Sequence, residues 1–155
     1  MATVTQMTDR LTQLASQLPM IAKLSVMETK EPYLNLNAEQ WAKGITKLGE
    51  RISLDGDPFY SPFTVRYKKE HGSGLGAVTD RVTMYMTGSM YGSADLELKE
   101  NNLNVTFGVP YAADLIERTT DKVFGLTNDN MGTYRGVFMN TFKPKVIEIT
   151  KLDFV

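Results

Sequence analysis

The sequence contains no cysteine, one histidine and no long apolar run. The absence of cysteine excludes disulfide bonds, thiolate nucleophiles and zinc–thiolate sites. A single histidine, His71, excludes metal sites built from several histidines. No segment approaches the ~20 apolar residues that a helix needs to cross a bilayer, and residues 1–18 lack the apolar run of a signal peptide. We therefore expect a soluble protein from a reducing cytosol, without a membrane partner.

An excess of charge of one sign is also missing. Lys and Arg number 17 and Asp and Glu 18, so a chain of net charge −1 has no broad attraction to nucleic acid or anionic membranes. The composition, 42% hydrophobic and 23% charged over 155 residues, is that of one globular domain with a sizeable core. The nine methionines have two interpretations, core filling or adaptable contact surfaces.

The stretch from residue 80 to residue 117 predicts the sheet. Residues 80–86 alternate apolar with polar side chains, which is typical of a strand. A two-residue turn at Asn101 and Asn102 then predicts a hairpin, because Asn tolerates the positive φ that such a turn requires. The register places three apolar pairs on one face: Leu98 with Val105, Leu96 with Phe107 and Ala94 with Val109. The opposite face carries Asp95, Glu97 and Lys99.

Helices are predicted on both sides of this sheet. Apolar residues at helical spacing favour helices over 5–18 and 20–27, and Pro19 ends the first or begins the second. Capping and breaking residues delimit two further helices, 37–43 before Gly44 and 62–71 between Ser61 and Gly72, while 111–117 forms a short helix or turn. A last helix is capped by Thr127. Gly132 and Gly136 weaken it, and Pro144 kinks or ends it. Residues 146–154 fit a continued helix or a final strand.

Together these elements predict an α+β fold in one domain, residues 1–155. An antiparallel sheet built on a central hairpin is packed by N-terminal helices and a C-terminal helix. The parts are a helical N-terminal part (1–44), the sheet and hairpin (80–117), and the C-terminal helix and tail (127–155). Trp41 is expected in the core.

No motif points to a reaction, a cofactor or a metal. Asp55-Gly56-Asp57 lacks the further oxygen ligands of a calcium loop and indicates a solvated turn. Residues 72–76 are glycine-rich, but no Gly-Lys-Ser/Thr follows, so a mobile loop is expected there. His71 lies at a predicted helix end, where it would interact with the helix dipole. The basic cluster 66–69 is interpreted as an exposed helical face, and Asp95 and Glu97 as a solvated one. We predict no catalytic, cofactor-binding or metal-binding residue.

The order of features between residues 44 and 117 resembles a family of phage proteins. These features are the helix start Tyr60-Ser61-Pro62, the segment from Lys69 to Gly72, a strand that ends at Gly88, the hairpin, and Tyr111-Ala112 followed by Glu117. They are similar to the virion-morphogenesis proteins of tailed bacteriophages, the neck and tail-completion group that includes Mu-like minor structural proteins. Val123-Phe124-Gly125 stands where the family often has Arg-Pro-Phe. The exact subfamily stays open.

The resemblance implies a non-enzymatic virion protein, assembled in the host cytoplasm, that forms a homo-oligomeric ring. It would be a neck, connector or tail-completion (tail-terminator-like) subunit beside other head-completion and tail proteins. Strand 103–109 offers an edge through which a sheet extends into the next copy. The candidate subunit-interface residues are Leu103, Val105, Phe107, Tyr111, Glu117 and Arg118. A nearly neutral chain would let DNA pass through the lumen without specific binding.

Two other functions remain open from the residues alone. A small hydrolase would use Asp or Glu side chains that the fold gathers into a cleft. A nucleic-acid-binding module would use the cluster from Arg66 to Lys69, in which an aromatic residue stands among basic ones.

Overall fold

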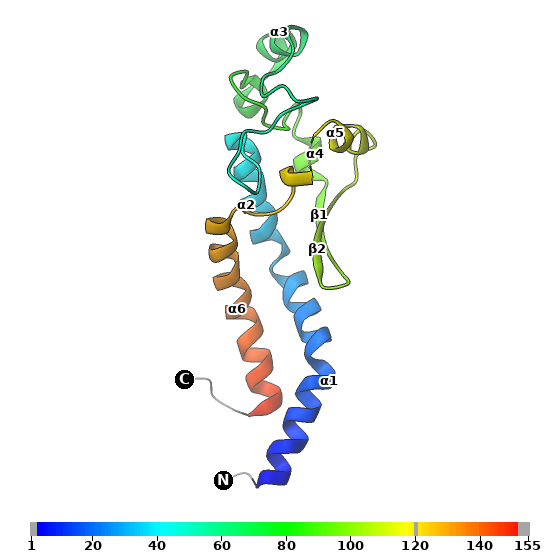
Figure 1. Cartoon of the computed structure of the whole chain (residues 1–155), viewed down its shortest axis with the longest axis vertical. Helices are drawn as coiled ribbons and strands as arrows, with labels where there is room; N and C mark the ends of the chain where they lie inside the picture. Colours follow the sequence, from blue (N-terminus) through cyan, green and yellow to red (C-terminus); the bar gives the residue numbers. More distant parts are fainter. Residues whose placement is uncertain (1–2, 120, 152–155) are drawn as a thin grey trace.

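The computed structural model describes residues 3–119 and 121–151, and within them it is an elongated α+β molecule (Figure 1). Helices α1 (Val4–Glu28) and α6 (Asn128–Thr150) run antiparallel, side by side, and form a stalk. Helix α2 (Lys30–Lys43) leads into a head, defined as residues 44–93 together with α5 (Ala112–Arg118). The sheet is a hairpin of β1 (Ala94–Lys99) and β2 (Asn102–Phe107). The predicted fold class is confirmed.

The head contains short helical segments joined by irregular chain. Besides α5, its α-helices are α3 (Pro62–His71) and α4 (Ser89–Gly92), and η1 (Gly74–Ala77) is a single 3₁₀ turn. A second 3₁₀ turn, η2 (Asp121–Val123), precedes α6. Figure 1 shows α3 at the end of the molecule opposite the first turns of α1.

Helix α1 is longer than the sequence predicts. It continues through Pro19, so the expected break there is wrong, as is the separate helix over 20–27. Proline removes one intrahelical hydrogen bond, to the carbonyl of residue 15, and Ala15 is exposed, so water can satisfy that carbonyl. The true break lies at Thr29, whose buried hydroxyl donates to the Ser25 carbonyl (2.7 Å) and pairs with the Tyr134 hydroxyl (3.0 Å).

Helix α2 therefore starts at Lys30 and not at residue 37, but its predicted end is confirmed. Gly44 adopts the left-handed conformation (φ 70°) that ends helices. The start of α3 is also confirmed, because the Ser61 hydroxyl accepts from the Thr64 N–H.

The predicted cap of the C-terminal helix is likewise confirmed. The Thr127 hydroxyl accepts from the Asn130 N–H at the start of α6. The helix passes Pro144 and reaches Thr150, so residues 146–150 are helical and not a strand. Residues 152–154, the rest of that prediction, lie outside the described residues.

The hairpin forms with its turn one residue earlier than predicted. Glu100 (φ 47°) and Asn101 (φ 68°) are the left-handed turn residues, so the register moves by two. The observed apolar pairs are Ala94 with Phe107, Leu96 with Val105 and Leu98 with Leu103. The predicted register would have placed Leu103 opposite Glu100, whereas the observed one gives Leu103 an apolar partner. A shift of two keeps every side chain on its predicted face.

The predicted strand over residues 80–86 is wrong. Within the described residues the sheet has two strands, and this segment is irregular. Met84 has φ 55°, a left-handed conformation that interrupts an extended strand. Among the described residues no strand pairs with this segment, so its backbone groups form hydrogen bonds with side chains instead.

Buried polar side chains of α2 join the head to the stalk. The Asn37 and Gln40 amides donate to the Gly125 carbonyl (2.9 and 3.0 Å), and the Thr127 N–H donates to Gln40 Oε1 (2.8 Å). The Trp41 indole donates to the Val123 carbonyl (2.9 Å). Trp41 is 1% exposed, which confirms it as a core residue. Its ring packs against three other aromatic rings, those of Tyr91, Phe107 and Phe124.

Glycine substitutions test this account of the helix ends and interiors. Gly44→Ala should lower the free energy of unfolding by about 1–3 kcal/mol, because φ is left-handed and a Cβ would lie 3.0 Å from the Val82 carbonyl oxygen. Gly132→Ala, inside α6 with nothing within 4 Å, should raise it by about 1 kcal/mol. Urea denaturation measures both changes. A neutral Gly44→Ala would contradict the described end of α2.

Candidate functional site

Side chains replace a missing strand along residues 82–87. The Thr83 N–H donates to the Tyr60 hydroxyl (2.9 Å), and the Tyr91 hydroxyl donates to the Thr83 carbonyl. The ammonium of Lys68 donates to the Tyr85 carbonyl (2.6 Å). Buried backbone groups must be hydrogen-bonded, and here three side chains from three segments satisfy them. The irregular segment is thereby held in one conformation.

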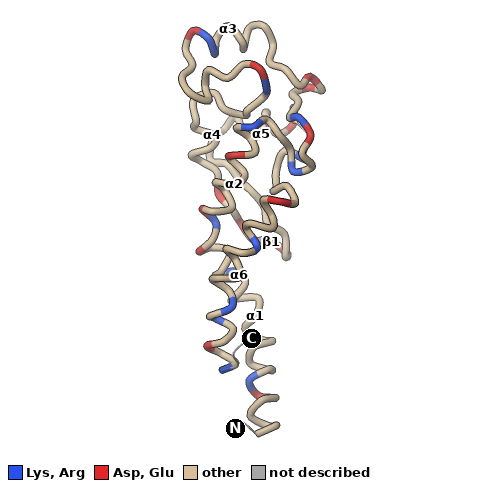
Figure 2. Tube along the Cα trace, turned by 90° about the vertical axis from the view of Figure 1, so that its left-hand side faces the viewer, with Lys and Arg blue, Asp and Glu red and all other residues tan. Residues whose placement is uncertain are grey.

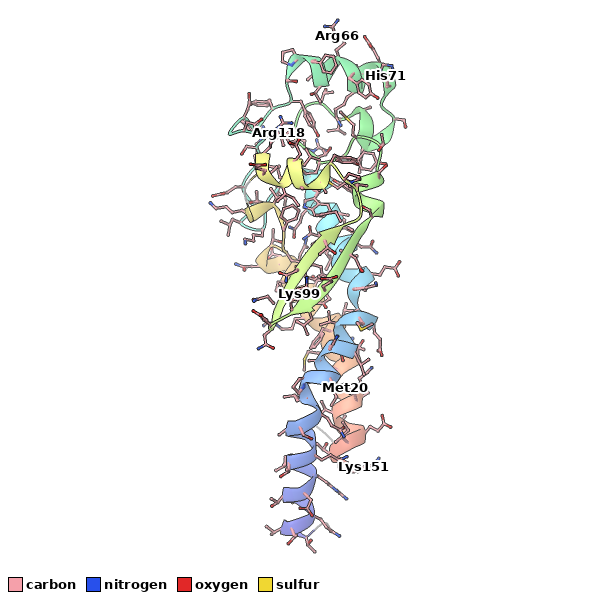
Figure 3. The ribbon with its side chains drawn as sticks, turned by 90° about the vertical axis from the view of Figure 1, so that its right-hand side faces the viewer. Met20, Arg66, His71, Lys99, Arg118 and Lys151 are labelled. Atoms are coloured by element: carbon pink, nitrogen blue, oxygen red, sulfur yellow. The ribbon has the colours of Figure 1, made fainter. Side chains whose placement is uncertain are left out.

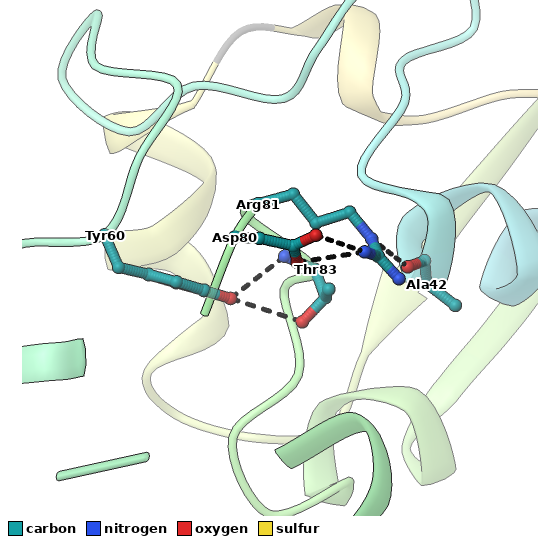
Figure 4. A network of polar contacts seen from close by, with 5 residues as sticks. All are labelled: Ala42, Tyr60, Asp80, Arg81 and Thr83. Carbon is teal, nitrogen blue, oxygen red and sulfur yellow. Dashed lines mark hydrogen bonds and ion pairs between the residues drawn. The ribbon is translucent and has the colours of Figure 1, made fainter. Parts of the chain in front are cut away.

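The start of the same segment is tied to α2 (Figure 4). The Arg81 guanidinium donates to the Ala42 carbonyl (3.0 Å) and to the Asp80 carboxylate (2.9 Å). Ala42 lies in the last turn of α2, where free carbonyls and the helix dipole favour a cation. Figure 4 also shows Tyr60 reaching Thr83, so both anchors meet at this point of the head.

A cleft of about 600 Å³ lies between this segment, the turn at residues 54–61 and α5. That volume is within the range of ligand sites, roughly 300–1,000 Å³. Val82 and Met84 are buried and contribute to its lining, while Phe59, Met86 and Tyr111 are exposed. The remaining lining residues are Leu54, Asp55, Asp57, Tyr60, Ser61, Thr64, Tyr85, Thr87, Asp114, Leu115 and Arg118. The cleft is thus mainly apolar and aromatic.

Three carboxylates and one guanidinium line the cleft. Arg118 donates through two nitrogens to Asp55 Oδ2 (3.0 and 2.8 Å), and this hydrogen bond raises the pKa of Arg118. Asp57 Oδ1 accepts from the Phe59 N–H (2.9 Å). No hydrogen bond or ion pair within 3–119 and 121–151 engages the carboxylate of Asp114. The charged part of the lining is therefore acidic on balance.

Lys68 contributes a positive charge behind the cleft wall. It is 1% exposed, and its ammonium lies 4.8 Å from the centre of the Tyr60 ring. Burial lowers the pKa of Lys68 because desolvation disfavours the charged form. The prediction of an exposed basic face over 66–69 is therefore wrong for Lys68. Arg66 and His71 are exposed at the far end of the head, as Figure 3 shows.

The six predicted interface residues separate into two groups. Leu103, Val105 and Phe107 are half-buried and pack against the core, and the Phe107 ring lies 5.7 Å from that of Trp41. The other three lie at or on α5: Tyr111, just before the helix, and Arg118 line the cleft, and Glu117 is exposed. The structure does not bring the six together. The interface itself stays a prediction.

A second surface lies on the stalk, along the helical stripe that the sequence predicts over residues 5–18. The α1 face is defined as Val4, Met7, Leu11, Ala15 and Leu18, which share one side of α1. Val4 is 82% exposed, Leu11 51% and Leu18 41%. α1 meets α6 through a neighbouring line of residues that includes Arg10, which donates to the Thr150 carbonyl (3.4 Å). The helical spacing was visible in the sequence, but the absence of a covering element was not.

Charged positions are sparse on this part of the stalk. Between Val4 and Leu18 the only charged residues are Asp9 and Arg10. Figure 2 shows both signs of charge interspersed over the rest of the molecule. The α1 face is therefore apolar and close to neutral.

Between residues 3 and 119 and between 121 and 151, no group of three or more His, Asp or Glu side chains is placed to hold a metal ion. None of the helices described is long and apolar enough to span a membrane.

Comparison of the chain with protein-family models, curated proteins and solved structures finds no match.

The network behind the cleft predicts a pH dependence of stability. Burial raises the pKa of Tyr91, with Tyr60 and Tyr85 adding to the effect, so the folded state keeps the Tyr91 proton above pH 10 while the unfolded state releases it. Stability present below pH 10 is then lost as pH rises, by up to about 1.4 kcal/mol per pH unit from this residue.

Tyr91→Phe separates the two contributions of this hydroxyl. At pH 7 the variant should lose about 1–3 kcal/mol, because the buried Thr83 carbonyl loses its donor. Between pH 10 and 11 it should lose less stability than the wild type. Urea denaturation at each pH measures both effects, and an unchanged alkaline slope would show that Tyr91 does not titrate as described.

Proposed function

We propose that the protein is a structural subunit of a tailed-bacteriophage virion. It forms a ring at the head–tail junction, as a neck, connector or tail-completion subunit, and it carries no catalytic role. The observation that carries the proposal is the α1 face, whose apolar side chains extend along four turns of an exposed helix. Exposed apolar surface of this kind marks sites of protein–protein contact.

The energetics favour association through this face. Full burial of a Val, Leu or Met side chain contributes about 1.5–3 kcal/mol. Met7, Leu11 and Leu18 retain 41–51% of their exposure, so a partner that covers them would add on the order of 1 kcal/mol each. The sparse charge on the face means that little desolvation of charged groups opposes this gain. A face of this composition supports assembly into a virion, where copies are held at high local concentration.

The sequence resemblance supplies the position in the virion. Neck and tail-completion proteins act as rings between the head and the tail, next to other head-completion and tail proteins. A ring requires a heterologous contact, in which two different surfaces of each copy meet and the rotation closes. The near-neutral chain supports passage of DNA through the lumen without specific binding.

A small hydrolase is the second candidate function, because three carboxylates line the cleft. Asp55 is engaged by Arg118 and Asp57 by the Phe59 N–H, which leaves Asp114 as the carboxylate most able to act on a bound group. A hydrolytic activity that is lost in Asp114→Asn and retained in Asp95→Asn, on the hairpin, would favour this function over the structural one.

Substitutions on α1 test the structural role. Met7→Glu with Leu11→Glu should reduce the assembly to single chains, because each carboxylate would be buried in an apolar contact. Thr12→Glu with Ser16→Glu, exposed on another side of α1, adds the same charge and should leave the assembly intact. Native mass spectrometry of the purified proteins measures the number of copies.

The same two variants are then compared in phage particles. The wild-type chain and the Thr12/Ser16 variant should be present in purified virions, and the Met7/Leu11 variant should be absent. A wild-type protein that is monomeric at every concentration and missing from virions would contradict the proposed function.

A further inference from the structure

We propose that the first turns of α1 in one copy insert into the head cleft of the next copy. This inference rests on the proposed assembly function and names the two surfaces that meet. The inserting segment, called the α1 tip, is Thr3–Leu11. The receiving surface is the cleft between residues 54–61, residues 82–87 and α5.

The α1 tip projects beyond the rest of the stalk. Arg10 contacts the carbonyl of Thr150, the last residue of α6, so residues 3–9 extend past the end of that helix. Every residue from Thr3 to Asp9 is exposed. Figure 3 shows α1 continuing below Lys151, and Figure 1 shows the same from another side.

The tip is a capped helix N-terminus. Thr3 and Gln6 form a capping box, in which the Thr3 hydroxyl accepts from the Gln6 N–H and the Gln6 amide accepts from the Thr3 N–H. The tip can therefore enter an apolar site without leaving these two backbone donors unpaired.

The tip and the cleft lie at opposite ends of the long axis. In Figure 3 Arg118, which lines the cleft, is in the head, whereas the tip lies below Met20 at the foot of the stalk. A chain cannot place its own tip in its own cleft without unfolding the stalk. A tip that occupies the cleft therefore comes from a second copy.

The two surfaces are complementary in chemistry. Val4, Met7 and Leu11 form an apolar row on the tip. The cleft is lined by exposed apolar side chains, Phe59, Met86 and Tyr111, and by two buried ones, Val82 and Met84. The N-terminal end of a helix carries a partial positive charge, which the acidic lining of the cleft favours.

This contact has a consequence for symmetry. It joins two different surfaces, so an open chain of copies keeps an unused tip at one end and an unused cleft at the other until it closes. Head-to-foot contacts of this kind form a ring when the rotation closes and a filament when it does not. A two-fold dimer through the α1 face would use the tips of both copies and would stop at two copies.

Complementation between two variants tests the contact. Val4→Glu with Met7→Glu disables the tip, and Met86→Glu with Tyr111→Glu disables the cleft at two exposed positions. Each variant alone should be a single chain by native mass spectrometry. An equimolar mixture should form dimers of one chain of each kind and nothing larger, because one intact tip and one intact cleft remain. Circular dichroism and thermal melting confirm that both variants fold.

Crosslinking gives a second measurement, which benefits from the absence of native cysteine. Met7→Cys and Met86→Cys, on separate copies, should form a disulfide on mild oxidation, because the proposed contact brings the two residues together. Met27→Cys, exposed on the opposite side of α1, should not crosslink to Met86→Cys. Mixed dimers together with this crosslink would support the proposal.

The remaining outcomes overturn the proposal. An unchanged assembly of the Met86/Tyr111 variant shows that the cleft is not the receiving surface, and the structural function then stands without this contact. A mixture that stays monomeric, or a direct crosslink between two Leu11→Cys copies, indicates a two-fold contact or another partner. Absence of the wild-type protein from purified virions would instead contradict the proposed function itself.

Discussion

The molecule depends on the way α2 binds the chain that precedes α6. Asn37, Gln40 and Trp41 donate from buried positions to backbone carbonyls at residues 123–125, and Gln40 also accepts the Thr127 N–H. A buried carbonyl left without a donor costs about 1–3 kcal/mol, so any other packing of α2 against this segment would be less stable. It fixes where α6 begins, and therefore where the stalk meets the head. The aromatic cluster around Trp41 then packs the hairpin and residues 82–91 against the same helix.

The cleft follows from the replacement of a strand partner by side chains. A second strand beside residues 82–87 would have covered one edge of this segment with backbone. Tyr60, Lys68 and Tyr91 satisfy the same groups from separate directions and leave the other side open. A buried ammonium is costly unless it is bonded, and Lys68 obtains both the Tyr85 carbonyl and the face of the Tyr60 ring. The apolar and acidic side chains that line the cleft stay accessible because of this arrangement.

The stalk and the head present unsatisfied apolar surface at opposite ends of an elongated chain. Two helices can bury only one line of each other's side chains, so the α1 face stays exposed in a single copy. The cleft is bounded in a different way, by the turn at residues 54–61, by α5 and by residues 82–87, and Arg118 of α5 is bonded to Asp55 of that turn. Complementary surfaces separated by the length of the molecule suit a chain of copies better than a closed pair.

The sequence by itself determined the features that depend on a few neighbouring residues: the caps at Ser61 and Thr127, the left-handed Gly44, and the two faces of the hairpin, which follow from the alternation of side chains. Tyr111 and Arg118 were candidate interface residues, and both are exposed, but their position beside residues 54–61 depends on the folded chain. Tertiary structure alone decided that α1 continues through Pro19 and that, among the described residues, no strand pairs with residues 80–86 and no element covers the α1 face. Each of these depends on which segments, distant in sequence, supply hydrogen bonds and apolar contacts, and periodicity within one segment carries no information about its partners.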